Sequence, residues 1–119
     1  MDVYRGLGEL PHFNQDLDIE PAPPAVAEWR SRLRNAQAIL ISSPEYAHGV
    51  PGSLKNALDW IVSSGEFMDK PVALFNPSQL SFHGQASLKE TLTVMMARVV
   101  VDTRDLDEAL SVLWALRRK

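Results

Sequence analysis

Residues 42–60 hold the residue types best suited to chemistry in this chain: Ser-Ser-Pro-Glu-Tyr-Ala-His-Gly-Val-Pro-Gly-Ser-Leu-Lys-Asn-Ala-Leu-Asp-Trp. They follow the apolar run 38–41, which has the pattern of a buried strand. They also open a helix whose first turn is expected to carry Pro51 and Gly52. Such a loop presents backbone N–H groups at the carboxyl end of a sheet, where open α/β sheets bind ligands. The segment therefore predicts a binding site built largely from backbone donors.

The elements that must position this loop alternate along the chain. Short apolar runs predict parallel strands near 37–42, 71–76 and 98–102. Apolar residues at helical spacing predict helices over about 25–35, from Pro51 onward, over about 85–97 and from Asp105 onward. The second and third of these helices are expected to bury one face each, made of Leu54, Ala57, Leu58, Ile61 and Val62 in one and of Leu88, Leu92, Met95 and Met96 in the other.

This alternation predicts a three-layer α/β domain over residues 1–119, with right-handed crossovers, a parallel sheet and helices on both of its faces. Prolines at 21, 23 and 24 prevent a helix before about residue 24, and Val3-Tyr4 forms at most a short strand. Trp29 and Trp60 are expected to pack in the core or in an interface.

Composition excludes several function classes. The 119 residues carry a formal net charge of −3 and no basic stripe, which argues against a nucleic-acid-binding face. The absence of cysteine excludes a thiolate zinc site and a thiol nucleophile, and we predict no metal site. No signal segment or membrane span is recognised in the sequence, so a soluble cytoplasmic protein is expected.

The chain resembles the NAD(P)H-dependent FMN reductase family, whose fold is flavodoxin-like. The resemblance covers nearly the whole chain, and the run Pro-Glu-Tyr, Pro-Gly, Lys-Asn-Ala, Asp-Trp is its most specific part. It is carried by residues 6–14 and 16–18, by Ser43-Pro44-Glu45-Tyr46-Ala47-His48-Gly49-Val50-Pro51-Gly52, by Leu54-Lys55-Asn56-Ala57-Leu58-Asp59-Trp60 and by Lys70-Pro71-Val72-Ala73.

The resemblance implies which residues hold the flavin ring. The loop after the middle strand would cradle the isoalloxazine ring through Pro44, Glu45, Tyr46, Ala47, His48 and Gly49. The loop after the next strand would close over the pyrimidine side through Ser78, His83 and Gly84. Some family members have Asn where Ala47 stands, so any side-chain amide contact there would be lost, while the backbone contacts would remain.

Structural interpretations of the same residues stay open. Gly49 and Gly52 fit simple turns, and His48 fits a solvated loop histidine better than a catalyst. The loop 76–86 equally fits an ordinary surface loop with a helix cap near Ser81. No catalytic side chain is predicted, because hydride transfer to a flavin needs no general acid.

The family's first strand and its Gly-Ser-x-Arg phosphate loop have no counterpart in this sequence, so the domain is expected to be N-terminally truncated. FMN is then expected to bind weakly, because a phosphate at a helix N-terminus would lose its donors. The strand at 37–42 would have an uncovered edge, and segment 1–20 would be displaced or would pair there.

The resemblance implies an FMN enzyme with NAD(P)H as co-substrate, acting by ping-pong hydride transfer on a quinone, azo compound, metal oxyanion or flavin. It also implies a homo-oligomer, either a dimer or a tetramer. The alternative is a truncated, non-catalytic relative that oligomerises or binds a partner. A different α/β nucleotide-binding protein is a third possibility.

Overall fold

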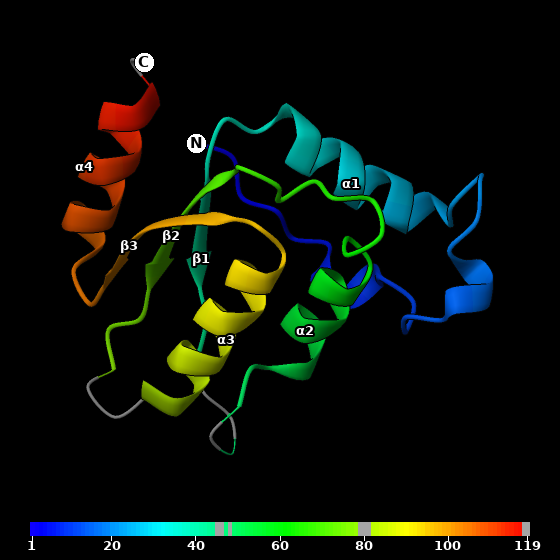
Figure 1. Ribbon diagram of the computed structural model, residues 1–119, viewed down its shortest axis with the longest axis horizontal. Helices are drawn as coiled ribbons and strands as arrows, with labels where there is room; N and C mark the ends of the chain where they lie inside the picture. The colour runs from blue at the N-terminus through cyan, green and yellow to red at the C-terminus, as the bar shows by residue number, and fades with distance from the viewer. Residues whose placement is uncertain (45–46, 48, 79–81, 118–119) are drawn as a thin grey trace.

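The computed structural model describes residues 1–44, 47, 49–78 and 82–117 and has α/β architecture (Figure 1). Its elements follow the alternation predicted from the sequence. In chain order they are the 3₁₀ turns η1 (Leu7–Glu9) and η2 (Gln15–Leu17), then α1 (Pro24–Asn35), β1 (Ile39–Ser42), α2 (Gly52–Asp59), β2 (Pro71–Phe75), α3 (Phe82–Val94), β3 (Arg98–Thr103) and α4 (Leu106–Arg117).

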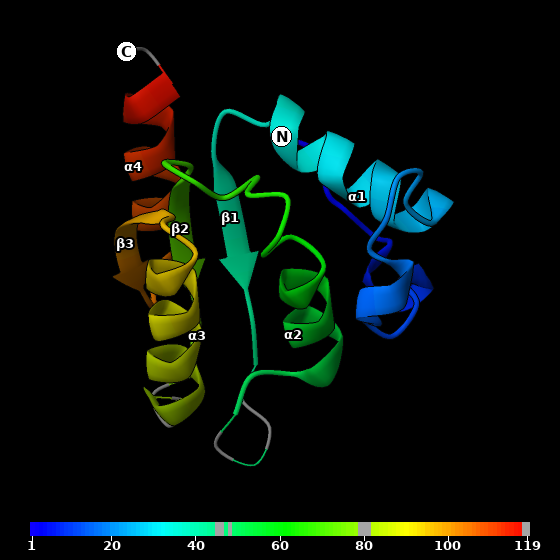
Figure 2. The same ribbon diagram turned by 45° about the vertical axis from the view of Figure 1, so that its right-hand side comes forward.

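The three strands form one parallel sheet in the order β1-β2-β3. Ser42 is paired with Phe75, so the strands β1 and β2 end level with each other. The views place α3 on one face of the sheet and α4 on the other (Figure 2). This arrangement confirms the predicted three-layer α/β class with parallel strands.

The segment before α1 lies against the helices instead of the sheet. The side chain of Asn56 on α2 donates to the Pro11 carbonyl (3.0 Å) and accepts from the Phe13 N–H (2.7 Å). The Trp60 indole N–H also donates to the Pro11 carbonyl, at 2.7 Å. Among the described residues no strand precedes β1, and β1 pairs only with β2. Of the two alternatives for segment 1–20, pairing with this edge is therefore wrong. Val3-Tyr4, for which at most a short strand was expected, forms no strand.

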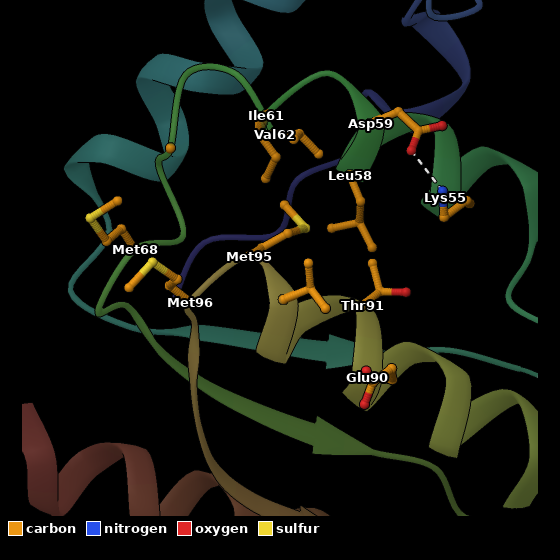
Figure 3. Close-up of a pocket in the computed structure, with 12 residues that line it drawn as sticks. Lys55, Leu58, Asp59, Ile61, Val62, Met68, Glu90, Thr91, Met95 and Met96 are labelled. Atoms are coloured by element: carbon orange, nitrogen blue, oxygen red, sulfur yellow. Dashed lines mark hydrogen bonds and ion pairs between the residues drawn. The ribbon is translucent and has the colours of Figure 1, made fainter.

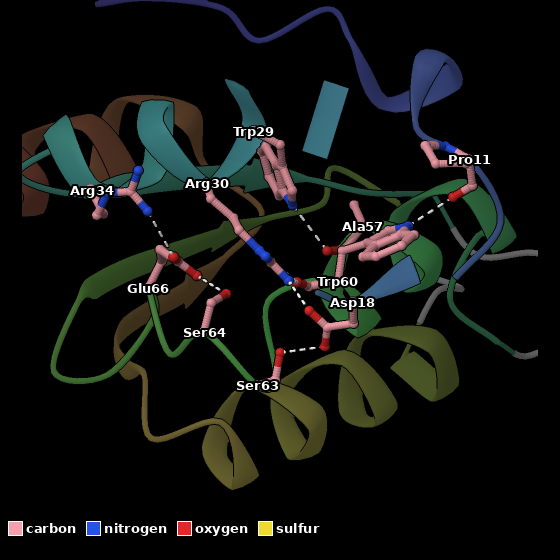
Figure 4. Close-up of polar contacts among 10 residues, drawn as sticks. All are labelled: Pro11, Asp18, Trp29, Arg30, Arg34, Ala57, Trp60, Ser63, Ser64 and Glu66. Carbon is pink, nitrogen blue, oxygen red and sulfur yellow. Dashed lines mark hydrogen bonds and ion pairs between the residues drawn. The ribbon is translucent and has the colours of Figure 1, made fainter. Parts of the chain in front are cut away.

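A buried arginine ties the same segment to the turn after α2 (Figure 4). The Arg30 guanidinium donates to Asp18 Oδ1 (2.9 Å) and, through Nε and Nη2, to the Trp60 carbonyl (3.1 and 2.6 Å). The Ser63 hydroxyl donates to Asp18 Oδ2 (2.6 Å). These hydrogen bonds from Ser63 and Arg30 lower the pKa of the Asp18 carboxyl below its usual value of 3.8.

The core lies between the sheet and the helices α1, α2 and α3. It contains both predicted tryptophans, since Trp29 is 7% exposed and Trp60 is fully buried. The other buried members are Leu10, Val26, Leu33, Leu54, Ala57, Leu58, Ile61, Phe67, Val72, Leu74, Leu88 and Leu92. Most residues of the predicted apolar helix faces thus lie in the core.

Four residues of those predicted faces, Ile61, Val62, Met95 and Met96, follow the ends of the helices, and two of them, Val62 and Met96, are exposed. After α2 the chain tightens into three-residue turns, with the Ile61 N–H bonded to the Leu58 carbonyl (3.1 Å), and Val62 is left 63% exposed. After α3, Met96 adopts a φ of +66° and is 58% exposed. The expectation that Val62 and Met96 belong to buried helix faces is therefore wrong, because the helices end earlier than the apolar pattern does.

Candidate functional site

The carboxyl edge of the sheet is held together by one buried residue. Asn76 follows β2 directly and is 7% exposed. Its Nδ2 donates to the Ser43 carbonyl after β1 (3.0 Å), and its backbone N–H donates to the Thr103 carbonyl at the end of β3 (3.1 Å). The ends of all three strands are thereby linked at the edge where a ligand of an open α/β sheet is expected.

The predicted loop after β1 begins at this edge. Pro44 is exposed, and the Ser43 hydroxyl donates to the Pro44 carbonyl at 3.0 Å. Ala47 is exposed and Gly49 is half-buried. Ala47 has a φ of +49°, a backbone conformation that glycine and asparagine adopt more readily than alanine. Three other predicted site residues, Glu45, Tyr46 and His48, lie outside the described residues.

The predicted residues after β2 divide between a turn and a helix. Ser78 is exposed, and its backbone N–H donates to Asn76 Oδ1 at 2.9 Å. His83 is exposed and Gly84 is buried. These two lie in the first turn of α3, which begins at Phe82, three residues earlier than predicted. The expected cap near Ser81 lies outside the described residues.

The helix α2 starts next to the first loop. Pro51 is buried and forms the N-cap, with its carbonyl accepting the Lys55 N–H at 3.0 Å, so the helix begins one residue later than expected. The first turn of α2 carries no acidic residue. The partial positive charge of this helix N-terminus is therefore not offset by a carboxylate within the turn, which favours an electron-rich ligand group.

The sequence did not identify Asn76 as a site residue; it was placed only at the end of the strand predicted near 71–76. The sequence Asn76-Pro77-Ser78 does hold a usable signal, because an Asn side chain that accepts from the N–H two residues later forms an Asx turn. The bond from Asn76 to the Ser43 carbonyl joins residues 33 positions apart, and no local pattern predicts it.

The described part of the edge is suited to binding more than to proton transfer. Among its described predicted residues, only His83 carries a titratable side chain. Away from this edge, burial and the nearby Glu28 carboxylate raise the pKa of the Tyr4 phenol, as hydrogen bonds lower the pKa of Asp18. No group of three or more His, Cys, Asp or Glu that could hold a metal occurs among the described residues. Nor is any helix in the described ranges long and apolar enough to cross a membrane.

A separate groove of about 380 Å³ lies between α2, the turns after it and the second half of α3 (Figure 3). The polar residues that line the groove include Lys55 and Asp59, which form an ion pair (2.7 Å). Several apolar side chains around it are more than half exposed, namely Val62, Met68, Val94 and Met96. This composition is typical of a packing surface and lacks the convergent polar groups of a small-molecule site.

Comparisons with known proteins agree with this architecture. The model of the family described as NADPH-dependent FMN reductase matches residues 2–109. An NAD(P)H-dependent FMN reductase of Pseudomonas aeruginosa is 36% identical over 94 residues, which is 75% of this chain and 51% of the relative. An NADPH:quinone oxidoreductase of Arabidopsis thaliana is 39% identical over 75 residues, which is 61% of this chain and 38% of the relative.

A solved structure gives the same result. The flavoenzyme FerB, an NAD(P)H:(acceptor) oxidoreductase from Paracoccus denitrificans, superposes with a TM-score of 0.70 at 26% sequence identity. The match covers 94% of this chain and 74% of FerB. The chain spans about half the length, or less, of the curated relatives it matches. With the family model matched from residue 2 to residue 109, this chain belongs to the NADPH-dependent FMN reductase family.

Proposed function

We propose that this chain takes part in NAD(P)H-dependent reduction of a small acceptor through FMN, and that it supplies the residues around the flavin ring. The observation that carries the proposal is the carboxyl edge of the parallel sheet in a member of this family. The names of relatives that reduce quinones support a quinone as the acceptor. Azo compounds, metal oxyanions and free flavin are the other acceptors to be tested.

The described residues fit the ring portion of FMN better than its phosphate. Pro44 and Ala47 are exposed residues of the loop that leaves β1 at the carboxyl edge of the sheet and leads to the N-terminus of α2. Polar ring atoms that gain electron density on reduction need donors and positive potential of this kind. We propose that Pro44, Glu45, Tyr46, Ala47, His48 and Gly49 line the ring on one side, with Ser78, His83 and Gly84 on the other.

When bound, FMN would supply the two-electron redox chemistry that couples oxidation of NAD(P)H to reduction of the acceptor in a ping-pong cycle. The part played by this chain is to hold the ring and leave one face open to both substrates. Positioning of this kind supplies much of the rate, and no side chain is assigned as an acid or base. The 119 residues contain no Gly-Ser-x-Arg sequence, so we expect weak FMN affinity from them alone.

A titration of FMN against the purified chain, followed by flavin fluorescence, tests the proposal. We expect saturable binding, and we expect Gly49→Val to weaken it because a branched side chain would block close approach of the backbone. His48→Ala, in the same loop, should weaken binding less than Gly49→Val and change turnover only modestly, because we propose that this loop holds the ring through its backbone. Absence of saturable binding up to millimolar FMN would refute the flavin role for this chain and favour the non-catalytic alternative.

We also propose that the chain assembles as a homo-oligomer in the cytoplasm. The exposed apolar side chains at the groove between α2 and α3, and the edge of β1, support the assembly. Light scattering at high concentration should then give a mass of at least twice 13.3 kDa. A monomer mass over the whole concentration range would contradict it.

A further inference from the structure

The side chain of Asn76 donates a hydrogen bond to one loop and accepts a hydrogen bond from another. Its Nδ2 donates to the Ser43 carbonyl (3.0 Å), in the loop after β1. Its Oδ1 accepts from the Ser78 N–H (2.9 Å), in the loop after β2. A carbonyl can only accept and a backbone N–H can only donate, so these partners fix the orientation of the amide group.

This bridge lies just beyond the last pair of the β1–β2 ladder. Ser42 and Phe75 form that last pair, and the two chains then leave the sheet in separate loops. An asparagine is suited to join them, because aspartate offers two acceptors and no donor, while serine is too short to span both partners. With Asn76 only 7% exposed, loss of either bond would leave a largely buried polar group without its partner.

We infer that Asn76 is a positioning residue for the flavin ring: it fixes the loops after β1 and β2 relative to each other, so that both contact the same ligand. The inference rests on the proposed function, since the two loops are those assigned to the ring. Ser43 links Asn76 to the ring loop, because the Ser43 hydroxyl donates to the carbonyl of Pro44 (3.0 Å), the first residue of that loop. Asn76 itself needs no contact with the flavin.

The chain offers a matched control in Asn56. Its side chain also bridges two polar groups, donating to the Pro11 carbonyl (3.0 Å) and accepting from the Phe13 N–H (2.7 Å), but it serves the N-terminal segment. The test compares Asn76→Asp and Asn76→Ala with Asn56→Asp and Asn56→Ala. In each comparison the substitution by Asp removes the donor and keeps an acceptor, whereas the substitution by Ala removes both.

Deuterium exchange without ligand gives the first readout. Asn76→Asp should raise exchange in peptides that cover the end of β1 and leave the Ser78 amide protected, because a carboxylate still accepts that bond. Asn76→Ala should raise exchange in both places. The Asn56 variants should raise exchange around Pro11 and Phe13 and in neither loop. Unchanged exchange at both loops in Asn76→Ala would overturn the inference.

Binding of FMN and of lumiflavin, which has the ring without the ribityl phosphate, gives the second readout. In each Asn76 variant the dissociation constants of FMN and of lumiflavin should rise by the same factor, about tenfold. The factor is the same because only contacts with the ring, which both ligands share, are weakened. The Asn56 variants should stay within about twofold of wild type when corrected for the folded fraction.

The outcomes separate the inference from the proposed function. If wild type binds FMN and the Asn76 variants shift its affinity no more than the Asn56 variants do, the inference is wrong and the proposed function stands. If the FMN constant shifts and the lumiflavin constant does not, the positioning of the ring is refuted. If wild type binds neither flavin, the proposed function fails, and the role of Asn76 toward a flavin fails with it.

Discussion

The Asp18–Arg30 ion pair should stabilise the fold far more than its exposed counterpart on α2. Side-chain exposure is 16% for Asp18 and 10% for Arg30. In the Lys55–Asp59 pair it is 49% and 37%. Distance alone would favour the exposed pair, because its charged nitrogen and oxygen are 2.7 Å apart, against 2.9 Å in the Asp18–Arg30 pair. A comparison of the two pairs therefore separates the effect of burial from that of distance.

Asp18→Ala removes the acceptor of two hydrogen bonds and leaves the Trp60 carbonyl as the one remaining hydrogen-bond partner of the Arg30 guanidinium among the described residues. Loss of one member of a fully buried pair costs about 3–5 kcal/mol, but Asp18 is only partly buried, so loss of its charge-assisted hydrogen bonds places the expected value at about 2 kcal/mol. Asp59→Ala should cost about 0.5 kcal/mol, because an exposed pair gains little over water.

Urea unfolding at pH 7 with linear extrapolation measures both losses. Equal losses for Asp18→Ala and Asp59→Ala, or a loss below about 1 kcal/mol for Asp18→Ala, would refute the argument from burial.

The same pair predicts a pH dependence whose sign follows from the lowered pKa of Asp18. The folded-state pKa lies below the ordinary 3.8, so the charged form is favoured by folding and its contribution is complete above 3.8. The contribution is lost as the pH falls through the lower, folded-state value. The stability gap between wild type and Asp18→Ala should therefore be constant from pH 7 to about pH 5 and should narrow below 3.8. A gap that widens in acid would contradict the assignment.

Three backbone positions give further predictions, each measured as a change in the free energy of unfolding. Met96→Gly should stabilise by about 0.5–1 kcal/mol, since φ is +66° at the end of α3 and the side chain is 58% exposed; a loss would mean that the methionine packs more than its exposure indicates. Ala47→Gly should stabilise by a similar amount of about 0.5–1 kcal/mol, because its φ is +49°, and no gain would argue against this loop conformation. Gly65→Ala should cost about 1 kcal/mol through its φ of +75° alone, as no atom lies within 4 Å of the added Cβ, so a neutral result would refute the strain.

The sequence predicted the order and type of the elements well, because local patterns set them. The strands near 37–42, 71–76 and 98–102 correspond to β1, β2 and β3, and each starts or ends within two residues of its expected bounds. Asp105 and Glu108 have the spacing of a capping box, in which the first side chain caps the helix and the second returns to the cap residue. Asp105 Oδ1 does accept from the N–H groups of Asp107 (2.9 Å) and Glu108 (3.4 Å), but the Glu108 carboxylate accepts from the Thr103 hydroxyl (3.2 Å) instead of returning to the cap.

Helix ends were predicted less well, because the spacing of apolar residues gives no information on where the backbone leaves the helical conformation. At the end of α3, the Ala97 N–H bonds to the Leu92 carbonyl (3.0 Å) and the Met96 N–H bonds to the Thr93 carbonyl (3.0 Å). This pair of bonds is a Schellman motif, in which the residue at the left-handed position is usually glycine. A methionine there carries no sequence signal of a helix end, so the apolar pattern was extended too far.

The candidate site shows the same division between local and distant interactions. The sequence identified the strand ends and the loops after them, and it could have identified the Asx turn at Asn76, which is local. It could not predict that Asn76 bonds to Ser43, because this bond depends on the level ends of two paired strands. Nor could it rank the strands by burial: Val72, Ala73 and Leu74 in β2 are fully buried, while the three apolar residues of β1 are half-buried.

The burial difference between β1 and β2 has a physical cause that bears on assembly. The strand β2 has a hydrogen-bonded neighbour on each side, whereas β1 has one neighbour among the described residues. An apolar strand with a half-buried edge offers its backbone donors and acceptors to another chain segment. The site on its carboxyl end is held from the β2 side by Asn76. The proposed ligand-binding geometry at this edge therefore depends on β2 and its asparagine, while the opposite edge of β1 stays available for packing.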